Sequence, residues 1–141
     1  QCRPGLRARL MDGLGRRAGI DLQVTADPAD VAAFARAVGA DPAAGTLPLT
    51  YPVAWLTRPE VVALVASLAA DRPMALPVHE VQTIETLAPV GPDARLDLSV
   101  AATRTDADRI TVEVVAQDAD RRPCLRMTGI LRLFDPARPA G

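Results

Sequence analysis

The stretch GTLPLTYPVAWLTRPEVVALVASLAADRPMALPVHE, residues 45–80, decides the fold of this chain. It predicts an apolar helix that is capped by Thr50, interrupted at Arg58-Pro59 and followed directly by a strand. Beyond the interruption there is almost no polar face, since the apolar residues are Val61, Val62, Leu64, Val65 and Leu68. A helix that is apolar nearly all round is expected to be enclosed by protein, and the strand-like sequence after it predicts an enclosing antiparallel sheet.

Runs of alternating apolar and polar residues, separated by short polar turns, make up the second half of the chain. They predict strands whose ranges are 79–87, 95–104, 109–117 and 124–134. Connections this short join antiparallel neighbours, so the runs are expected to form a meander. An antiparallel sheet wrapped around a central helix is the hotdog arrangement, and we therefore predict an α+β protein of this fold; the order of elements also leaves open another α+β sandwich.

The first part of the chain predicts one clear helix and one short strand. The helix covers 25–39, begins at a cap provided by Thr25 or Asp27, and ends at Gly39. Its expected apolar stripe is Val31, Phe34, Ala35 and Val38. We expect residues 1–20 to form a short helix or a tail and 20–24 a short strand. The resulting division is a tail or short helix with the first strand over 1–24, a hotdog domain over 25–135, and a flexible tail over 136–141.

Composition restricts the classes of partner and chemistry. The net charge is −1, so neither nucleic acid nor an anionic membrane is expected as a partner. All 16 basic residues are Arg, so a lysine Schiff base is excluded. Two cysteines, Cys2 and Cys124, predict neither a disulfide framework nor a metal site, and no cofactor is expected. No secretory signal or membrane span is predicted, and a reducing, cytoplasmic location is expected.

Four short motifs occur in order along the chain. They are VAAFARAVG at 31–39, TLPLTYP at 46–52, PVHE at 77–80 and LAPVG at 87–91. Together they resemble MaoC-like acyl dehydratases over about residues 25–135, most closely the amino-terminal hotdog of double-hotdog members. The resemblance implies an acyl-CoA or acyl-carrier-protein thioester as ligand, in fatty-acid or polyketide metabolism. It also implies a second hotdog subunit, in a homodimer or a heterodimer.

The sequence departs from this family at the positions that carry its chemistry. The catalytic half of the family has an Asp, usually followed by Pro, and a His four or five residues after the Asp; these two groups act as general acid and base. Here Asp41-Pro42 is followed by Ala43, Ala44, Gly45 and Thr46, with no His. The Arg of the family's Arg-Pro-Leu turn is also absent, since this chain has Leu87-Ala88-Pro89. The resemblance therefore implies a non-catalytic subunit that holds the acyl chain.

Three ionisable residues are candidates for chemistry. His79, the only histidine, lies beside Glu80 and is either a base or ligand-facing group, or a residue that fixes a strand end. Asp41 is either a relic of the catalytic Asp or an ordinary turn residue. Glu80 could serve alone in a thioesterase. Glu80 and Glu85 have opposite strand parity, so they are expected on opposite faces of the strand and form no carboxylate pair. The alternatives that stay open are a stand-alone hotdog thioesterase or dehydratase using these residues, and a structural or regulatory hotdog without a thioester.

Further candidates for binding are found at the start of the central helix and near the end of the chain. The substrate-binding candidates are Thr50, Tyr51, Pro52 and Trp55, together with His79. They either shape an acyl tunnel or pack in the core, and free N–H groups at this helix start could polarise a thioester carbonyl. The candidates for binding the phosphates of coenzyme A are Arg121, Arg122, Arg126 and Arg132, which otherwise form a solvated face. Cys124 is expected to be a small buried side chain.

Overall fold

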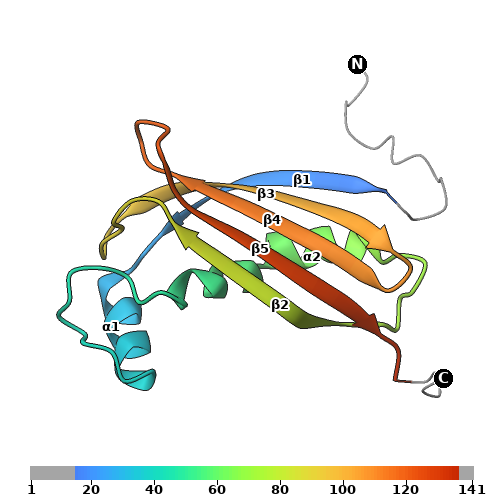
Figure 1. Cartoon of the computed structure of the whole chain (residues 1–141), viewed down its shortest axis with the longest axis horizontal. Helices are drawn as coiled ribbons and strands as arrows, with labels where there is room; N and C mark the ends of the chain where they lie inside the picture. Colours follow the sequence, from blue (N-terminus) through green and yellow to red (C-terminus); the bar gives the residue numbers. More distant parts are fainter. Residues whose placement is uncertain (1–14, 137–141) are drawn as a thin grey trace.

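A single antiparallel sheet lies across one side of the central helix in the computed structural model, which describes residues 15–136 (Figure 1). In chain order the elements are β1 (Arg17–Thr25), α1 (Pro28–Ala37), the 3-10 helix η1 (Tyr51–Thr57), α2 (Pro59–Leu68), β2 (Leu76–Thr86), β3 (Arg95–Asp106), β4 (Arg109–Gln117) and β5 (Pro123–Phe134). The sheet has five strands in the order β1-β3-β4-β5-β2. The predicted α+β class and the predicted sheet around a central helix are confirmed.

The connectivity differs from the predicted meander at one strand. Strands β3, β4 and β5 are consecutive neighbours, but β2 pairs with β5 and not with β3. The reason is the path of residues 87–94, which leave beside the start of β5 and cross to the end of β1. Leu87 N–H donates to the Cys124 carbonyl (2.8 Å), whereas Asp93 N–H donates to the Ala26 carbonyl (2.7 Å). Consequently β1 and β2 are the two edges of the sheet.

The core lies between the concave face of the sheet and the central helix. The strand residues that alternation places inward are buried, as predicted: Leu96, Leu98, Val100 and Ala102 on β3, and Ile110, Val112, Val114 and Ala116 on β4. The helix α2 contributes Val61, Leu64, Val65 and Leu68 to the same cluster. These residues are largely Val, Leu, Ile and Ala, in keeping with a chain that contains two Phe, one Tyr and one Trp.

The predicted first helix is confirmed as α1, with its cap at Asp27. The Asp27 carboxylate accepts hydrogen bonds from the backbone N–H of Ala29 (2.8 Å) and of Asp30 (3.2 Å). Gly39 follows the helix with φ +75°, the left-handed conformation that glycine adopts without strain. Val38, predicted on the apolar stripe, is instead 54% exposed because the helix has already ended there.

The helix or tail predicted for residues 1–20 is wrong at residues 17–20. Residues 17–20 are strand rather than helix, since β1 pairs with β3 from Arg17, opposite Thr103, to Thr25, opposite Arg95. The short strand expected at 20–24 is thus confirmed and is longer than predicted. Glycines disfavour a helix here, and the backbone gains hydrogen bonds along β3. The rest of the predicted helix, at 1–14, lies outside the described residues.

The central helix departs from the prediction in two respects. Its first part is the 3-10 helix η1, and Thr50 makes no side-chain cap bond. At the interruption Arg58 has ψ 142°, because a residue before proline avoids the helical conformation. The second difference is burial: α2 is not enclosed, since Val62 is 55% exposed. One five-stranded sheet covers one side of a helix, so the opposite apolar side stays open in a single chain.

A buried arginine joins the end of α2 to the β3–β4 turn. Arg104 on β3 is 2% exposed, and its guanidinium donates to the carbonyl of Leu68 (2.8 Å) and to the carboxylate of Asp71 (2.7 and 3.3 Å). Its remaining N–H groups donate to the carbonyls of Asp106 and Ala107. All five donors of the guanidinium therefore have partners. Arg104 fixes the position of the helix end relative to the sheet.

Candidate functional site

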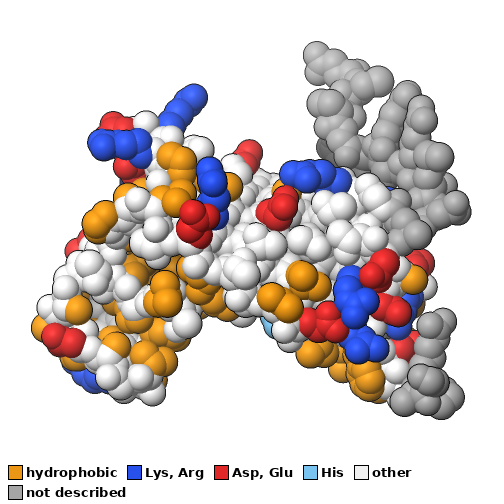
Figure 2. Space-filling model, viewed as in Figure 1, with side chains coloured by type: hydrophobic (Ala, Val, Ile, Leu, Met, Phe, Trp, Pro, Cys, Tyr) orange, Lys and Arg blue, Asp and Glu red, His pale blue; other side chains and the backbone are white. Residues whose placement is uncertain are grey.

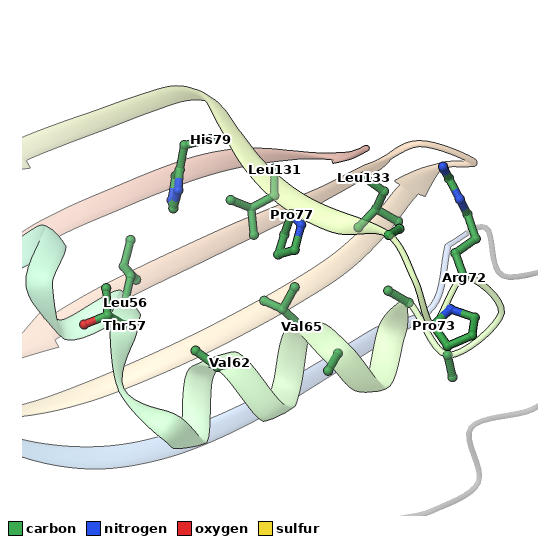
Figure 3. A pocket seen from close by; sticks show the side chains of 14 residues that line it. Leu56, Thr57, Val62, Val65, Arg72, Pro73, Pro77, His79, Leu131 and Leu133 are labelled. Atoms are coloured by element: carbon green, nitrogen blue, oxygen red, sulfur yellow. The ribbon is translucent and has the colours of Figure 1, made fainter. Parts of the chain in front are cut away.

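The exposed side of α2 faces a cavity of about 510 Å³ beneath strands β2 and β5 (Figure 3). We call it the main cavity; it is lined by Leu56, Thr57, Val62, Val65, Ala66, Ala69, Ala70, Arg72, Pro73, Ala75, Pro77, His79, Leu131 and Leu133. Most of these side chains are aliphatic. The arrangement suits the hydrocarbon part of a ligand, with a small number of polar groups to orient it.

His79 lies on the strand side of the main cavity. It is opposite Leu131 in the pairing of β2 with β5, and its imidazole points from β2 towards Leu56 and Thr57 (Figure 3). Within the part of the chain that the structure describes, the imidazole forms no hydrogen bond with protein. His79 therefore does not fix the strand end through a hydrogen bond, and its two ring nitrogens are available to a ligand.

Glu80 does not accompany His79, because neighbouring residues of a strand point to opposite faces of the sheet. His79 is opposite Leu131 and Val81 is opposite Ile130, so Glu80 is the extra residue in β2. Its carboxylate binds Arg109 at 2.9 Å, which raises the pKa of the Arg109 guanidinium. The ion pair lies on the outer face, since Arg109 alternates with inward-facing Ile110.

The extra residue, a β-bulge, changes the parity of the residues that follow it. Glu85 is opposite Arg126 on the outer face, so the expectation that Glu80 and Glu85 lie on opposite faces is wrong. Gln82 is opposite Gly129, on the same inner face as His79. Simple alternation from His79 would have placed Gln82 on the outer face.

Asp41 lies outside the main cavity. Its carboxylate accepts a hydrogen bond from the backbone N–H of Ala43 (2.9 Å), in an exposed turn between α1 and η1. This is the usual local role of an Asp that starts a turn. Of the three predicted ionisable candidates, the structure places only His79 at the cavity.

The aromatic residues at the start of the central helix pack in the core. Tyr51 makes edge-to-face contacts with Phe34 and with Trp55, at ring-centroid distances of 5.5 and 6.1 Å. Burial, with smaller effects from Asp30 and Asp27, raises the pKa of the Tyr51 hydroxyl. Neither Tyr51 nor Trp55 lines the main cavity.

Two other predicted residues of this region have different surroundings. Pro52 lines a second cavity, of about 250 Å³, together with Thr46, Leu47, Pro48, Leu49, Ile84, Thr86, Pro89, Val90 and Leu125. Thr50 is exposed and lines neither cavity. The predicted binding residues are thus divided between the core, the surface and two cavities.

The four arginines predicted to bind phosphate line neither cavity. Arg122 lies near Asp118 and Asp120 in the β4–β5 turn, whereas Arg132 is 3.8 Å from Glu80 at the other end of β5. The arginine at the main cavity is Arg72, which sequence reasoning missed. It is 13% exposed and pairs with Asp108, a contact between residues far apart in sequence that no local spacing signals.

Cys124 is buried, as predicted. Its sulfur lies 3.5 Å from the Arg122 carbonyl, and burial raises the pKa of the thiol. Between residues 15 and 136, no group of three His, Cys, Asp or Glu side chains is arranged to hold a metal ion. The same residues include no helix long and apolar enough to span a membrane.

Comparisons with known proteins give similarity in structure without similarity in sequence. No protein-family model and no curated protein matches the sequence. The C-terminally truncated HadBC complex, a 3R-hydroxyacyl-ACP dehydratase of Mycobacterium tuberculosis, has a chain with TM-score 0.60 and 15% identity; the match covers 85% of this chain and 97% of that chain. A probable thioesterase of Bartonella henselae has TM-score 0.62 and 15% identity, covering 86% and 95%.

A third structure similar to this chain contains a ligand. It is a hypothetical thioesterase of Streptococcus pneumoniae TIGR4 with coenzyme A, with TM-score 0.57 and 9% identity, covering 83% of this chain and 82% of that chain. At such identities the likeness concerns the course of the backbone. With its five-stranded antiparallel sheet curved around a central helix, this chain has the hotdog fold.

Proposed function

We propose that this chain binds the acyl group of an acyl-CoA or acyl-carrier-protein thioester in the main cavity. In this proposal it is the non-catalytic hotdog subunit of a 3-hydroxyacyl dehydratase or enoyl hydratase in fatty-acid or polyketide metabolism. The observation that carries the proposal is the aliphatic cavity beside the open side of α2. Similar folds in a 3R-hydroxyacyl-ACP dehydratase and in a protein with coenzyme A support the ligand class.

The positions of the ionisable residues support a non-catalytic role. Acid–base chemistry on a 2-enoyl thioester needs two groups placed near the reacting carbons. Here Asp41 lies in an exposed turn and Glu80 is paired with Arg109 on the outer face, so neither accompanies His79. A catalytic pair would then come from a partner subunit.

The edge strand β2 is the proposed contact with that partner, a second hotdog of the same or another kind. Among residues 15–136 only one side of β2 is paired, and three apolar side chains along it are about half exposed: Leu76, Val78 and Val81. Figure 2 shows hydrophobic side chains along the lower margin of the molecule, where Figure 1 places β2. Long apolar edge strands pair readily with another strand. Such a partner would also lie beside the open side of the main cavity.

Binding can be tested by calorimetry with saturated acyl-CoA thioesters of increasing chain length. If the cavity holds the acyl chain, affinity should rise with length until the cavity is full, because each buried CH₂ contributes up to about 0.8 kcal/mol. Ala66→Trp, on the lining of the cavity, should abolish this increase. Ala63→Trp is the matched control, because Ala63 is an exposed residue of the same helix outside the cavity lining. Equal affinities for short and long chains would refute the proposal.

A second candidate function rests on the free imidazole of His79. In that case the chain alone is a thioesterase or hydratase with His79 as general base, as imidazoles often serve. Purified protein would be assayed for hydrolysis of acyl-CoA and hydration of 2-enoyl-CoA. Turnover abolished by His79→Ala, with acyl-CoA binding retained, would replace the non-catalytic assignment. A chain that binds no thioester at all would instead favour a structural or regulatory role.

A further inference from the structure

We infer that Gln82 contacts the ligand and determines its specificity: its side-chain carbonyl accepts a hydrogen bond from an O–H or N–H group of the bound thioester. The inference rests on the proposed function, since it takes the main cavity as the place of the acyl group. Its evidence is a buried acceptor without a donor, an adjacent free imidazole, and a glycine that makes room for both side chains.

The orientation of the Gln82 amide is fixed by its hydrogen bonds. Its Nε2 donates to the backbone carbonyls of Thr83 (3.1 Å) and Thr128 (3.3 Å). Both partners are acceptors, so the nitrogen and not the oxygen must face them. The carbonyl oxygen is buried, and no donor among residues 15–136 reaches it. Leaving such an acceptor unsatisfied costs about 1–3 kcal/mol, which a ligand that supplies a donor would recover.

Gly129 leaves room for both the Gln82 oxygen and the His79 ring. An added Cβ at Gly129 would lie 2.9 Å from the Gln82 oxygen and 3.7 Å from the Cδ2 atom of His79. The two side chains therefore converge over the same glycine, on the inner face of β2 and β5. Any larger residue at this position would displace the Gln82 carbonyl, so the absence of a side chain preserves the arrangement.

Gln82 itself lines neither cavity, but on the inner face of β2 it lies between residues that do. Pro77 and His79, which precede it, line the main cavity, and Ile84 and Thr86, which follow it, line the second cavity. Under this inference, a ligand that extends along β2 from one cavity into the other would pass Gln82 and uncover its buried carbonyl. A thioester has donors that suit this position in two places: the hydroxyl of a 3-hydroxyacyl group, and the amide N–H groups of the pantetheine arm.

The test compares the affinities of wild type and Gln82→Leu for a saturated acyl-CoA and for the 3-hydroxyacyl-CoA of the same length. If the hydroxyl is the donor, the substitution should weaken binding of the hydroxylated ligand about tenfold and leave the saturated one unchanged. If a pantetheine amide is the donor, both should weaken about tenfold. Thr83→Val is the matched control, because Thr83 lies on the outer face of the same strand, opposite Thr128.

Gly129→Ala provides an independent variant that keeps the Gln82 side chain but moves its oxygen. It should lower the affinity for the same thioester or thioesters as Gln82→Leu does. If wild type binds the thioesters and Gln82→Leu binds each of them as tightly as wild type does, the inference about Gln82 is overturned while the proposed function stands. If wild type binds neither, the proposed function fails, and the inference fails with it.

Discussion

Replacement of Arg104 by methionine tests whether the buried guanidinium stabilises the fold mainly as a cap of α2 or as an ion pair. The side chain is 2% exposed and donates to three backbone carbonyls and one carboxylate. Methionine keeps an apolar stem of similar length in the same space but donates no hydrogen bond. The variant therefore removes the donors and largely preserves the packing.

The expected loss follows from the surroundings of each partner. The Leu68 carbonyl is buried at the end of α2, so losing its donor costs about 1–3 kcal/mol. The Asp71 side chain is 55% exposed and can be solvated, so its ion pair contributes about 0–1 kcal/mol. Partly buried carbonyls at Asp106 and Ala107 add a smaller amount. We expect Arg104→Met to lower the free energy of unfolding by about 2–4 kcal/mol, and Asp71→Asn to lower it by about 1 kcal/mol at most.

Urea unfolding followed by far-ultraviolet circular dichroism measures both losses. For a domain of this size the Arg104→Met midpoint should fall by about 1–2 M at an unchanged slope. The Asp71→Asn effect should shrink in about 1 M salt, whereas the Arg104→Met effect should persist because a buried carbonyl is not screened. If both variants lose equal stability and respond equally to salt, the ion pair dominates and the capping argument is refuted.

Three further outcomes are expected. Asp27→Ala removes the cap of α1 and should cost about 1 kcal/mol in urea unfolding, and an unchanged midpoint would contradict the assigned cap. The hydrogen bond from Arg104 holds the pKa of Asp71 below its usual range, so this carboxylate stabilises the fold above the unfolded-state pKa and ceases to do so as pH falls through the folded-state pKa. Wild type should therefore lose more stability than Asp71→Asn between about pH 5 and pH 2, and parallel acid titrations would refute this. For the proposed homodimer through β2, Val78→Lys on the edge strand should lower the dimer fraction in sedimentation velocity with little change in melting temperature, and an unaltered dimer would exclude β2 as the contact.

Local patterns in the sequence were sufficient for the elements whose structure depends on neighbouring residues. The α1 boundaries follow from a capping carboxylate at Asp27 and a left-handed glycine at Gly39, both of which act within a few residues. The inward faces of β3 and β4 follow from strict alternation. The same alternation, continued from Ala102, places Arg104 inward, so this buried arginine was also accessible to sequence reasoning.

The remaining features depend on contacts between distant parts of the chain. That β2 pairs with β5 follows from the path of residues 87–94, whose hydrogen bonds to Ala26 and Cys124 have no sequence signature. The open side of α2 could not be predicted from its apolar composition, because composition does not say how many layers cover a helix. The resemblance predicted the hotdog fold, but the cavity lining includes Arg72, which no motif indicated.

The bulge at Glu80 means that residue count, rather than residue identity, decides which side chains of β2 lie on the inner face of the sheet. If the chain lacked one residue at this position, either His79 or Gln82 would lie on the outer face of the sheet. Alignments of other hotdog sequences with this one should therefore allow a one-residue gap at Glu80. Without it, columns on one side of that position would equate residues of the inner face with residues of the outer face.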